Sequence, residues 1–182
     1  TFIINGTERV VVSQLIRSPG VYFDAVEERT TGRALSTSKL IPDRGAWMEF
    51  ETRKSDYLTI KFNRKRTIPV TILLRALAAV KDQMPEDFSP IKTGSDEELL
   101  AIFAEVDNNP DRHYIETTIK NEPKWELKKD QTLAQAALIE FYRRMRPGDP
   151  PTLDNAREFL TSQLFDQRRY DLERVGRYKL NQ

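Results

Sequence analysis

The sequence predicts an α+β fold, in which a mixed or antiparallel sheet from the N-terminal third is packed by helices from the C-terminal two thirds. Residues 2–62 contain short apolar runs that alternate with polar residues and are separated by turn residues, a pattern typical of strands. Residues 69–164 instead repeat apolar residues at helical spacing between capping residues. At 182 residues, the chain is long enough for one well-buried domain or two small ones.

The strands are expected in order along residues 2–62. Asn5 and Gly6 favour a type I′ turn, because both residues readily adopt positive φ, and they predict a hairpin between residues 2–4 and 8–14. Further strands are predicted at 39–41, 47–51 and 57–62, the last with Leu58, Ile60 and Phe62 on one face. Residues 54–56 are expected to form a turn and residues 30–33 an exposed loop.

Four helices are expected after the strands. Pro69 suits the first turn of one helix, which is followed by a loop at 82–93. Ser95 and Glu98 could form a capping box on the next helix, whose buried stripe is expected to comprise Leu99, Leu100, Ile102, Phe103 and Val106. Asp130 or Thr132 opens the longest helix, which Pro147 and Gly148 stop, and Thr152 caps the last one.

The composition removes most familiar catalytic chemistry. The chain has no cysteine and one histidine, so disulfides and thiolate metal sites are impossible, and an intracellular setting is the simplest interpretation. His113 is interpreted as a surface residue rather than a metal ligand, and Ser13 lacks the flanking glycines of a nucleophile elbow. No glycine-rich phosphate loop occurs, and no apolar run is long enough to span a bilayer. The chain begins at Thr1 on an apolar strand, as expected for a piece of a longer protein.

What the residues do suggest is a binding surface. The net charge is only +1, but basic residues gather at 64–66, 143–146, 168–169 and 174–179, where arginines could contact phosphates. Trp47, beside Arg44 and Gly45, could stack on an unpaired base or could equally be a core aromatic. Trp125 lacks such neighbours and is expected to be a packing anchor.

Four runs in the chain carry a family resemblance. They are NGTERVVVSQLIRSPGV at 5–21, IP followed by RGAW at 41–47, YRRMRPGDPP at 142–151, and RYDL followed by VGR at 169–177. In this order they resemble the β subunit of bacterial RNA polymerase. The resemblance implies that residues 1–182 form a single lobe domain, the second domain of that subunit, with residues 1–8 joining it to the neighbouring protrusion.

The resemblance also implies roles for individual residues. Arg17 and Trp47 would line a pocket for an extruded non-template base, together with Asn63, where the family commonly has Asp; Ile16 likewise replaces a residue that is commonly His. Arg64, Arg66, Arg146 and Arg169 would face DNA or the sigma factor. Val12 and Gln14 match the edge of the rifamycin pocket.

The same resemblance implies a setting in the cell. The lobe would line the main cleft and contact downstream DNA and the non-template strand, in a cytoplasmic, nucleoid-associated enzyme. Its partners would be the α, β′ and ω subunits, the rest of β, the sigma factor, DNA and regulatory transcription factors, with no membrane. No cofactor is expected in this chain, because the family holds its magnesium ions in β′, and the isolated chain is expected to be inactive.

Two other function classes stay open. An autonomous single-strand nucleic-acid-binding module would use the same residues, but should carry several regularly spaced exposed aromatics, and only Trp47 and Tyr57 qualify. An isolated hydrolase would need an activated nucleophile or a metal site, which the absent cysteine and the single histidine disfavour.

Overall fold

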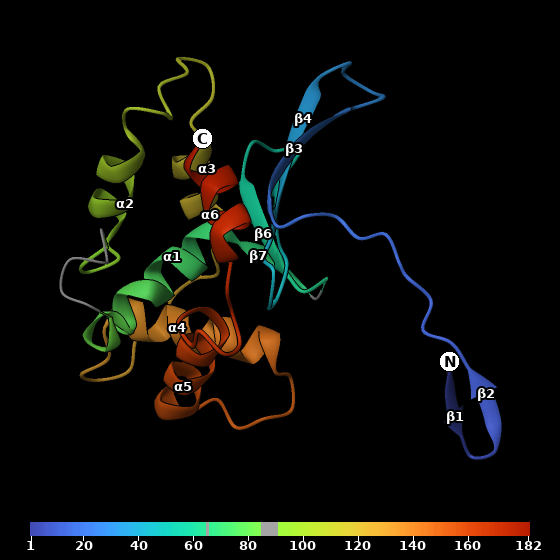
Figure 1. Ribbon diagram of the computed structural model, residues 1–182. Coiled ribbons are helices and arrows are strands. Elements are labelled where there is room, and N and C mark those ends of the chain that lie inside the picture. Colours follow the sequence, from blue (N-terminus) through green and yellow to red (C-terminus); the bar gives the residue numbers. More distant parts are fainter. Residues whose placement is uncertain (65, 85–90) are drawn as a thin grey trace.

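The computed structural model describes residues 1–64, 66–84 and 91–182. In this part of the chain, a five-stranded antiparallel sheet in the order β3-β4-β5-β6-β7 packs against helices, and a separate hairpin lies at the N-terminus. The α+β prediction is therefore confirmed, with an antiparallel sheet (Figure 1). The elements are β1 (Phe2–Ile4), β2 (Thr7–Arg9), β3 (Gly20–Glu27), β4 (Ala34–Ile41), β5 (Met48–Thr52), β6 (Leu58–Phe62), β7 (Thr67–Pro69), α1 (Val70–Ala79), η1 (Lys81–Gln83), α2 (Asp96–Phe103), α3 (Tyr114–Lys120), α4 (Leu133–Met145), α5 (Leu153–Leu164) and α6 (Glu173–Asn181).

The first 18 residues form an exposed arm that leaves the body of the molecule (Figure 1). The predicted hairpin is confirmed: Asn5 and Gly6 have φ of 50° and 76°, and β1 pairs with β2. The second strand ends at Arg9 rather than at residue 14, and residues 10–18 continue as exposed coil.

The sheet has one buried face and one polar face. Phe50, Ile60 and Ile68 lie opposite one another on β5, β6 and β7, and the last two are fully buried beneath the helices. On the other face, Lys39 pairs with Glu49 at 3.2 Å and Lys61 with Glu51 at 2.6 Å. Strand alternation thus places apolar residues in the core and ionic pairs on the opposite surface.

The core lies where α1 and α4 cover the buried face of the sheet. Phe62 of β6 meets Phe141 of α4 edge-to-face, with ring centroids 5.6 Å apart. Phe159 of α5 packs on the same layer, 5.5 Å from the ring of Tyr142. Trp125 packs against this core, as expected.

The predicted caps at Thr132 and Thr152 are confirmed. Thr132 and Gln135 form a complete capping box on α4, and Thr152 accepts a hydrogen bond from the Asn155 N–H on α5. Ser95 caps α2 by accepting the Glu98 N–H, but the Glu98 carboxylate turns to residues 92–94 instead of completing the box.

Several predictions for the elements were incomplete or wrong. The sequence patterns did not predict β7, α3, α6 or the eight-residue strand β3, and they predicted only the end of β4. The expected buried stripe of α2 is largely wrong, because only Leu99 is buried and Leu100, Ile102 and Val106 are exposed. Helix α2 contacts α3, and Leu100 and Ile102 beside the buried Leu99 remain exposed. Of the predicted loop at 82–93, residues 85–90 lie outside the described residues.

Candidate nucleic-acid interface

A surface hollow of about 800 Å³ lies between the base of the arm and the polar face of the sheet. We call it the Trp47 hollow. Its volume is within the range of ligand sites. Its walls come from the arm, β3, β4, the loop before β5 and the turn after β6, and it is lined by Leu15, Ile16, Arg17, Pro19, Tyr22, Phe23, Asp24, Thr37, Lys39, Ile41, Pro42, Asp43, Trp47 and Arg64.

Trp47 is half-buried at the point where the chain enters β5. Its carbonyl accepts the Asn63 N–H at 2.8 Å, which joins the loop before β5 to the turn after β6. The guanidinium of Arg64 lies 5.3 Å from the centroid of the Trp47 ring, within the range of a cation–π contact. Within the described part of the chain, Trp47 is not among the residues packed on the core. The Trp47 side chain therefore forms part of the wall of the hollow and not part of the core.

Arg17 reaches the same hollow from the arm. Its guanidinium lies 5.2 Å from the centroid of the Tyr22 ring and not over Trp47. The two predicted pocket residues Arg17 and Trp47 therefore share one hollow without stacking on each other. Asn63 contributes its backbone to the turn and is exposed, but it does not line the hollow. Arg66 is also exposed and does not line it, and Lys65 between them lies outside the described residues.

The charges in the Trp47 hollow are of both signs. Arg17 and Arg64 have no ion pair with any residue that the structure describes, whereas Lys39 is held by Glu49. Asp24 and Asp43 add carboxylate acceptors to the lining. Unpaired guanidinium groups suit phosphate oxygens, and carboxylates can accept amino groups of bases. Tyr22, Lys39 and Asp43 were not predicted as lining residues. The strand β3, which carries Tyr22, was itself not predicted.

A second hollow, of about 350 Å³, contains Arg146 and Arg169. We call it the Arg146 hollow. Arg146 lies 3.6 Å from Asp149 and 5.5 Å from the Phe159 ring, and Arg169 lies 3.8 Å from Asp166. Both arginine side chains are more than half exposed. Burial raises the pKa of the Tyr142 hydroxyl beside them. The structure therefore brings Arg146 and Arg169 together, in a hollow that is separate from the Trp47 hollow.

Val12 and Gln14 lie on the exposed coil of the arm. The Val12 side chain is 84% exposed, and neither residue lines the Trp47 hollow. Both residues are therefore exposed in this chain, and their role at the edge of the rifamycin pocket stays a prediction.

The described residues contain neither a cluster of metal ligands nor a helix that could span a membrane. No group of three or more potential metal ligands comes together there, and His113 is an exposed residue at the start of α3. In the same part of the chain, no helix has the length and apolar character needed to cross a bilayer.

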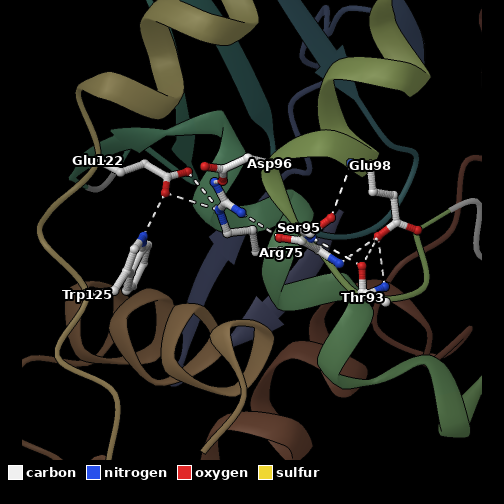
Figure 2. A network of polar contacts seen from close by, with 8 residues as sticks. Arg75, Thr93, Ser95, Asp96, Glu98, Glu122 and Trp125 are labelled. Atoms are coloured by element: carbon white, nitrogen blue, oxygen red, sulfur yellow. Dashed lines mark hydrogen bonds and ion pairs between the residues drawn. The ribbon is translucent and has the colours of Figure 1, made fainter.

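A polar cluster around the buried Arg75 joins α1 to the start of α2 and to the segment that follows α3. We call it the Arg75 cluster. Figure 2 shows Arg75 between Glu122 and Asp96, at distances of 3.1 and 2.5 Å. The Gly94 carbonyl accepts a further N–H at 2.5 Å, and Trp125 donates to Glu122 at 2.9 Å. Arg75 is only 1% exposed, so this charge is fully engaged in holding the fold together.

Glu98 is held at the same helix end by hydrogen bonds rather than by a cation (Figure 2). Desolvation opposes its ionisation, but the backbone N–H groups of residues 92–94 and the Thr93 hydroxyl donate to its carboxylate. Together they lower the pKa of Glu98 to about 2. The carboxylate therefore stays ionised and fixes the loop that enters α2.

Comparison with known families identifies the chain. The family "RNA polymerase Rpb2, domain 2" matches residues 17–182. The chain belongs to this family. The match begins at Arg17, so most of the arm lies outside it. The resemblance predicted from the four sequence runs is therefore confirmed.

Curated relatives extend the match over the whole chain. The chain is 53% identical to a DNA-directed RNA polymerase subunit beta of Chloroflexus aggregans, 48% to that of Dehalococcoides mccartyi and 46% to that of Listeria monocytogenes. Each alignment covers 100% of this chain but only 13% to 15% of the relative. These relatives favour the polymerase assignment over the autonomous single-strand-binding module.

Proposed function

We propose that this domain serves as the lobe of a DNA-directed RNA polymerase β subunit and that its Trp47 hollow accepts one extruded base of the non-template strand. The observation that carries the proposal is the convergence of Arg17, Trp47 and Arg64 on one hollow, although they come from three separate segments. An aromatic ring supplies a stacking surface for a base, and two guanidinium groups without carboxylate partners among the described residues supply donors.

The other predicted arginines extend the same nucleic-acid surface. Arg64 lies in the turn after β6, Arg66 directly precedes β7, and Arg146 and Arg169 share the Arg146 hollow. Partly exposed guanidinium groups position a nucleic-acid backbone without reading its sequence. We assign this surface to downstream DNA, promoter single strand or the sigma factor, along the main cleft of the assembled enzyme.

Catalysis belongs elsewhere in the proposed assembly. The partner β′ subunit would hold the magnesium ions, and the domain would act in the cytoplasm with α, β′, ω, the rest of β, the sigma factor and regulatory factors, near the nucleoid. The purified 182-residue chain should therefore lack nucleotidyl transfer activity. Magnesium-dependent RNA synthesis that survives repurification of this chain would contradict the assignment of the active site to β′.

The test of the hollow is Trp47→Ala in the full β subunit, assembled into polymerase. Loss of base stacking should cost about 1–3 kcal/mol in the open complex, shortening its lifetime and reducing its dependence on the non-template base near the start site. Tyr57→Ala is the matched control, because Tyr57 is a half-buried aromatic outside the hollow. An unchanged base dependence in Trp47→Ala, at a temperature where the enzyme stays folded, would reject the proposal.

A further inference from the structure

The two walls of the Trp47 hollow are held by the same C-terminal segment. Residues 169–179, which we call the C-terminal brace, run from the Arg146 hollow into α6. In Figure 1, α6 lies against the sheet, and it packs on β3 at the base of the arm. The brace therefore contacts the chain on both sides of the hollow, near Trp47 and near Arg17.

The first contact holds the loop that carries Trp47. Arg44 and Asp171 exchange two backbone hydrogen bonds, of 3.1 and 2.9 Å. The next residue, Gly45, has φ of +122° and lies flush against the brace: a Cβ atom there would come within 2.7 Å of the Tyr170 ring and 2.9 Å of the Arg169 carbonyl oxygen. Only glycine fits this close approach without displacing the loop or the brace.

The second contact holds the base of the arm that carries Arg17. A Cβ atom on Gly176 of α6 would come within 3.0 Å of the Pro19 Cβ, and Lys179 lies directly over Gly20. The Lys179 ammonium donates to the Ser18 hydroxyl at 2.6 Å and lies 5.7 Å from the Tyr22 ring, on which Arg17 also rests at 5.2 Å. The backbone next to Arg17 is thus fixed to α6.

Arg17 and Trp47 share the hollow without stacking on each other. Their separation is consequently set by the elements that hold each wall, and a base that stacks on one and hydrogen-bonds to the other needs that separation to be fixed. The brace supplies the connection, because it joins the Arg44–Gly45 loop to Pro19 and Gly20 through one short run of backbone and one helix.

We infer that the C-terminal brace is the positioning element of the Trp47 hollow, with Gly45 and Gly176 as its positioning residues. This inference rests on the proposed capture of a non-template base. The brace does not touch the base. It holds Arg17 and Trp47, which contact the base, at a fixed separation. The backbone that holds the Trp47 loop also carries Arg169 into the Arg146 hollow.

Gly45→Ala, introduced into the full β subunit and assembled into polymerase, tests this role. The readout is the ratio of open-complex lifetimes across the four non-template bases near the start site. Crowding against Tyr170 should shift the loop and reduce this ratio by about threefold or more, because a small misplacement of a positioned group weakens its interaction. Gly32→Ala is the control, since Gly32 also has positive φ, of +67°, but a Cβ there would meet only the Glu27 side chain at 3.7 Å.

A double variant separates positioning from general destabilisation. If Gly45 acts through Trp47, adding Gly45→Ala to Trp47→Ala should cause little further loss of base dependence. An equal loss in both backgrounds would overturn the inference, as would an unchanged ratio in Gly45→Ala. Should Gly45→Ala fail to assemble, Lys179→Met keeps the test open: it removes the ammonium on Ser18, and Lys179→Arg should restore the ratio.

The two proposals fail in different ways. If Trp47→Ala leaves the base dependence unchanged, the hollow does not bind the base and the proposed function is wrong. If Trp47→Ala reduces the dependence while Gly45→Ala and Lys179→Met do not, the hollow binds the base and the brace does not position it.

Discussion

Arginine side chains in the Trp47 hollow and in the Arg75 cluster have opposite surroundings. Arg75 is buried between two carboxylates and a carbonyl, and its main partner Glu122 is only 3% exposed. Arg17 and Arg64 instead rest on aromatic rings at the surface, without an ion pair to the residues described. A guanidinium that is already paired inside the domain therefore stabilises the fold, whereas one that rests on an aromatic face remains free for a ligand.

The largest expected loss of stability comes from removing the buried Arg75 side chain. Arg75→Met should lower the free energy of unfolding by about 3–5 kcal/mol, because it leaves Glu122 buried without its cation. Urea denaturation of the 182-residue chain measures it. Arg143→Met, which removes an exposed pair with Glu140, should change the stability by about 0.5 kcal/mol or less.

A double variant tests the stated cause. Adding Glu122→Gln to Arg75→Met removes the uncompensated charge and should recover part of the lost stability. No recovery, or equal losses in Arg75→Met and Arg143→Met, would mean that the buried charge cluster is not what stabilises this region.

The anion beside the cluster gives a pH-dependent effect. The pKa of Glu98 is about 2 in the folded chain, below its ordinary value of 4.5. Its stabilisation is therefore present above pH 4.5 and is lost as the pH falls toward 2, by about 1–2 kcal/mol after solvent screening is allowed for. Glu98→Gln should flatten this part of a plot of stability against pH, and the exposed Glu97→Gln should not. A plot that is unchanged in Glu98→Gln would contradict the assignment.

Trp47 should behave as a surface residue when stability is measured. Trp47→Ala should lower the free energy of unfolding by about 1 kcal/mol, against about 3–5 kcal/mol for Phe141→Ala, which empties the core between α4 and the sheet. Thermal unfolding of both variants checks this. If Trp47→Ala lowered the stability as much as Phe141→Ala, the indole would belong to the core, and the contrast between the hollow and the core would be wrong.

The smallest effect concerns salt. The chain alone should bind single-stranded DNA weakly, with an affinity that falls steeply as salt rises. Arg64→Ala should reduce the slope of log affinity against log salt by about 1, whereas the paired Arg143→Ala should leave it nearly unchanged. Fluorescence anisotropy across a salt series measures both. Tight binding at physiological salt would favour an autonomous single-strand-binding module.

Local signals predicted the elements whose residues decide their own conformation. Asn5-Gly6 predicted a hairpin that the structure contains, and Thr132 and Thr152 predicted the starts of α4 and α5. The alternation of Leu58, Ile60 and Phe62 likewise predicted β6. In each case the prediction depends only on residues close together in sequence, which form a local hydrogen bond or one buried face.

Elements that depend on distant partners were missed. Strand β3 has little apolar periodicity, and its outer half is exposed, because pairing with β4 rather than burial holds it. Helix α6 lies against the base of the arm through Gly176, a residue that alone predicts no helix. For α2, apolar periodicity predicted burial that the neighbouring elements do not supply.

The fold class, the main helix caps and the family could be predicted from the sequence, since they follow from local hydrogen bonding, periodicity and four ordered runs of residues. The sequence also pointed to Arg17 and Trp47, but only through resemblance. Only folding places these two residues in one hollow with Arg64, leaves Asn63 outside it, and pairs Arg75 with a buried carboxylate while Arg17 and Arg64 have no ion pair among the described residues. The physical reason is that a charge or a ring acquires its role from groups brought close by folding, and those groups lie far away in the chain.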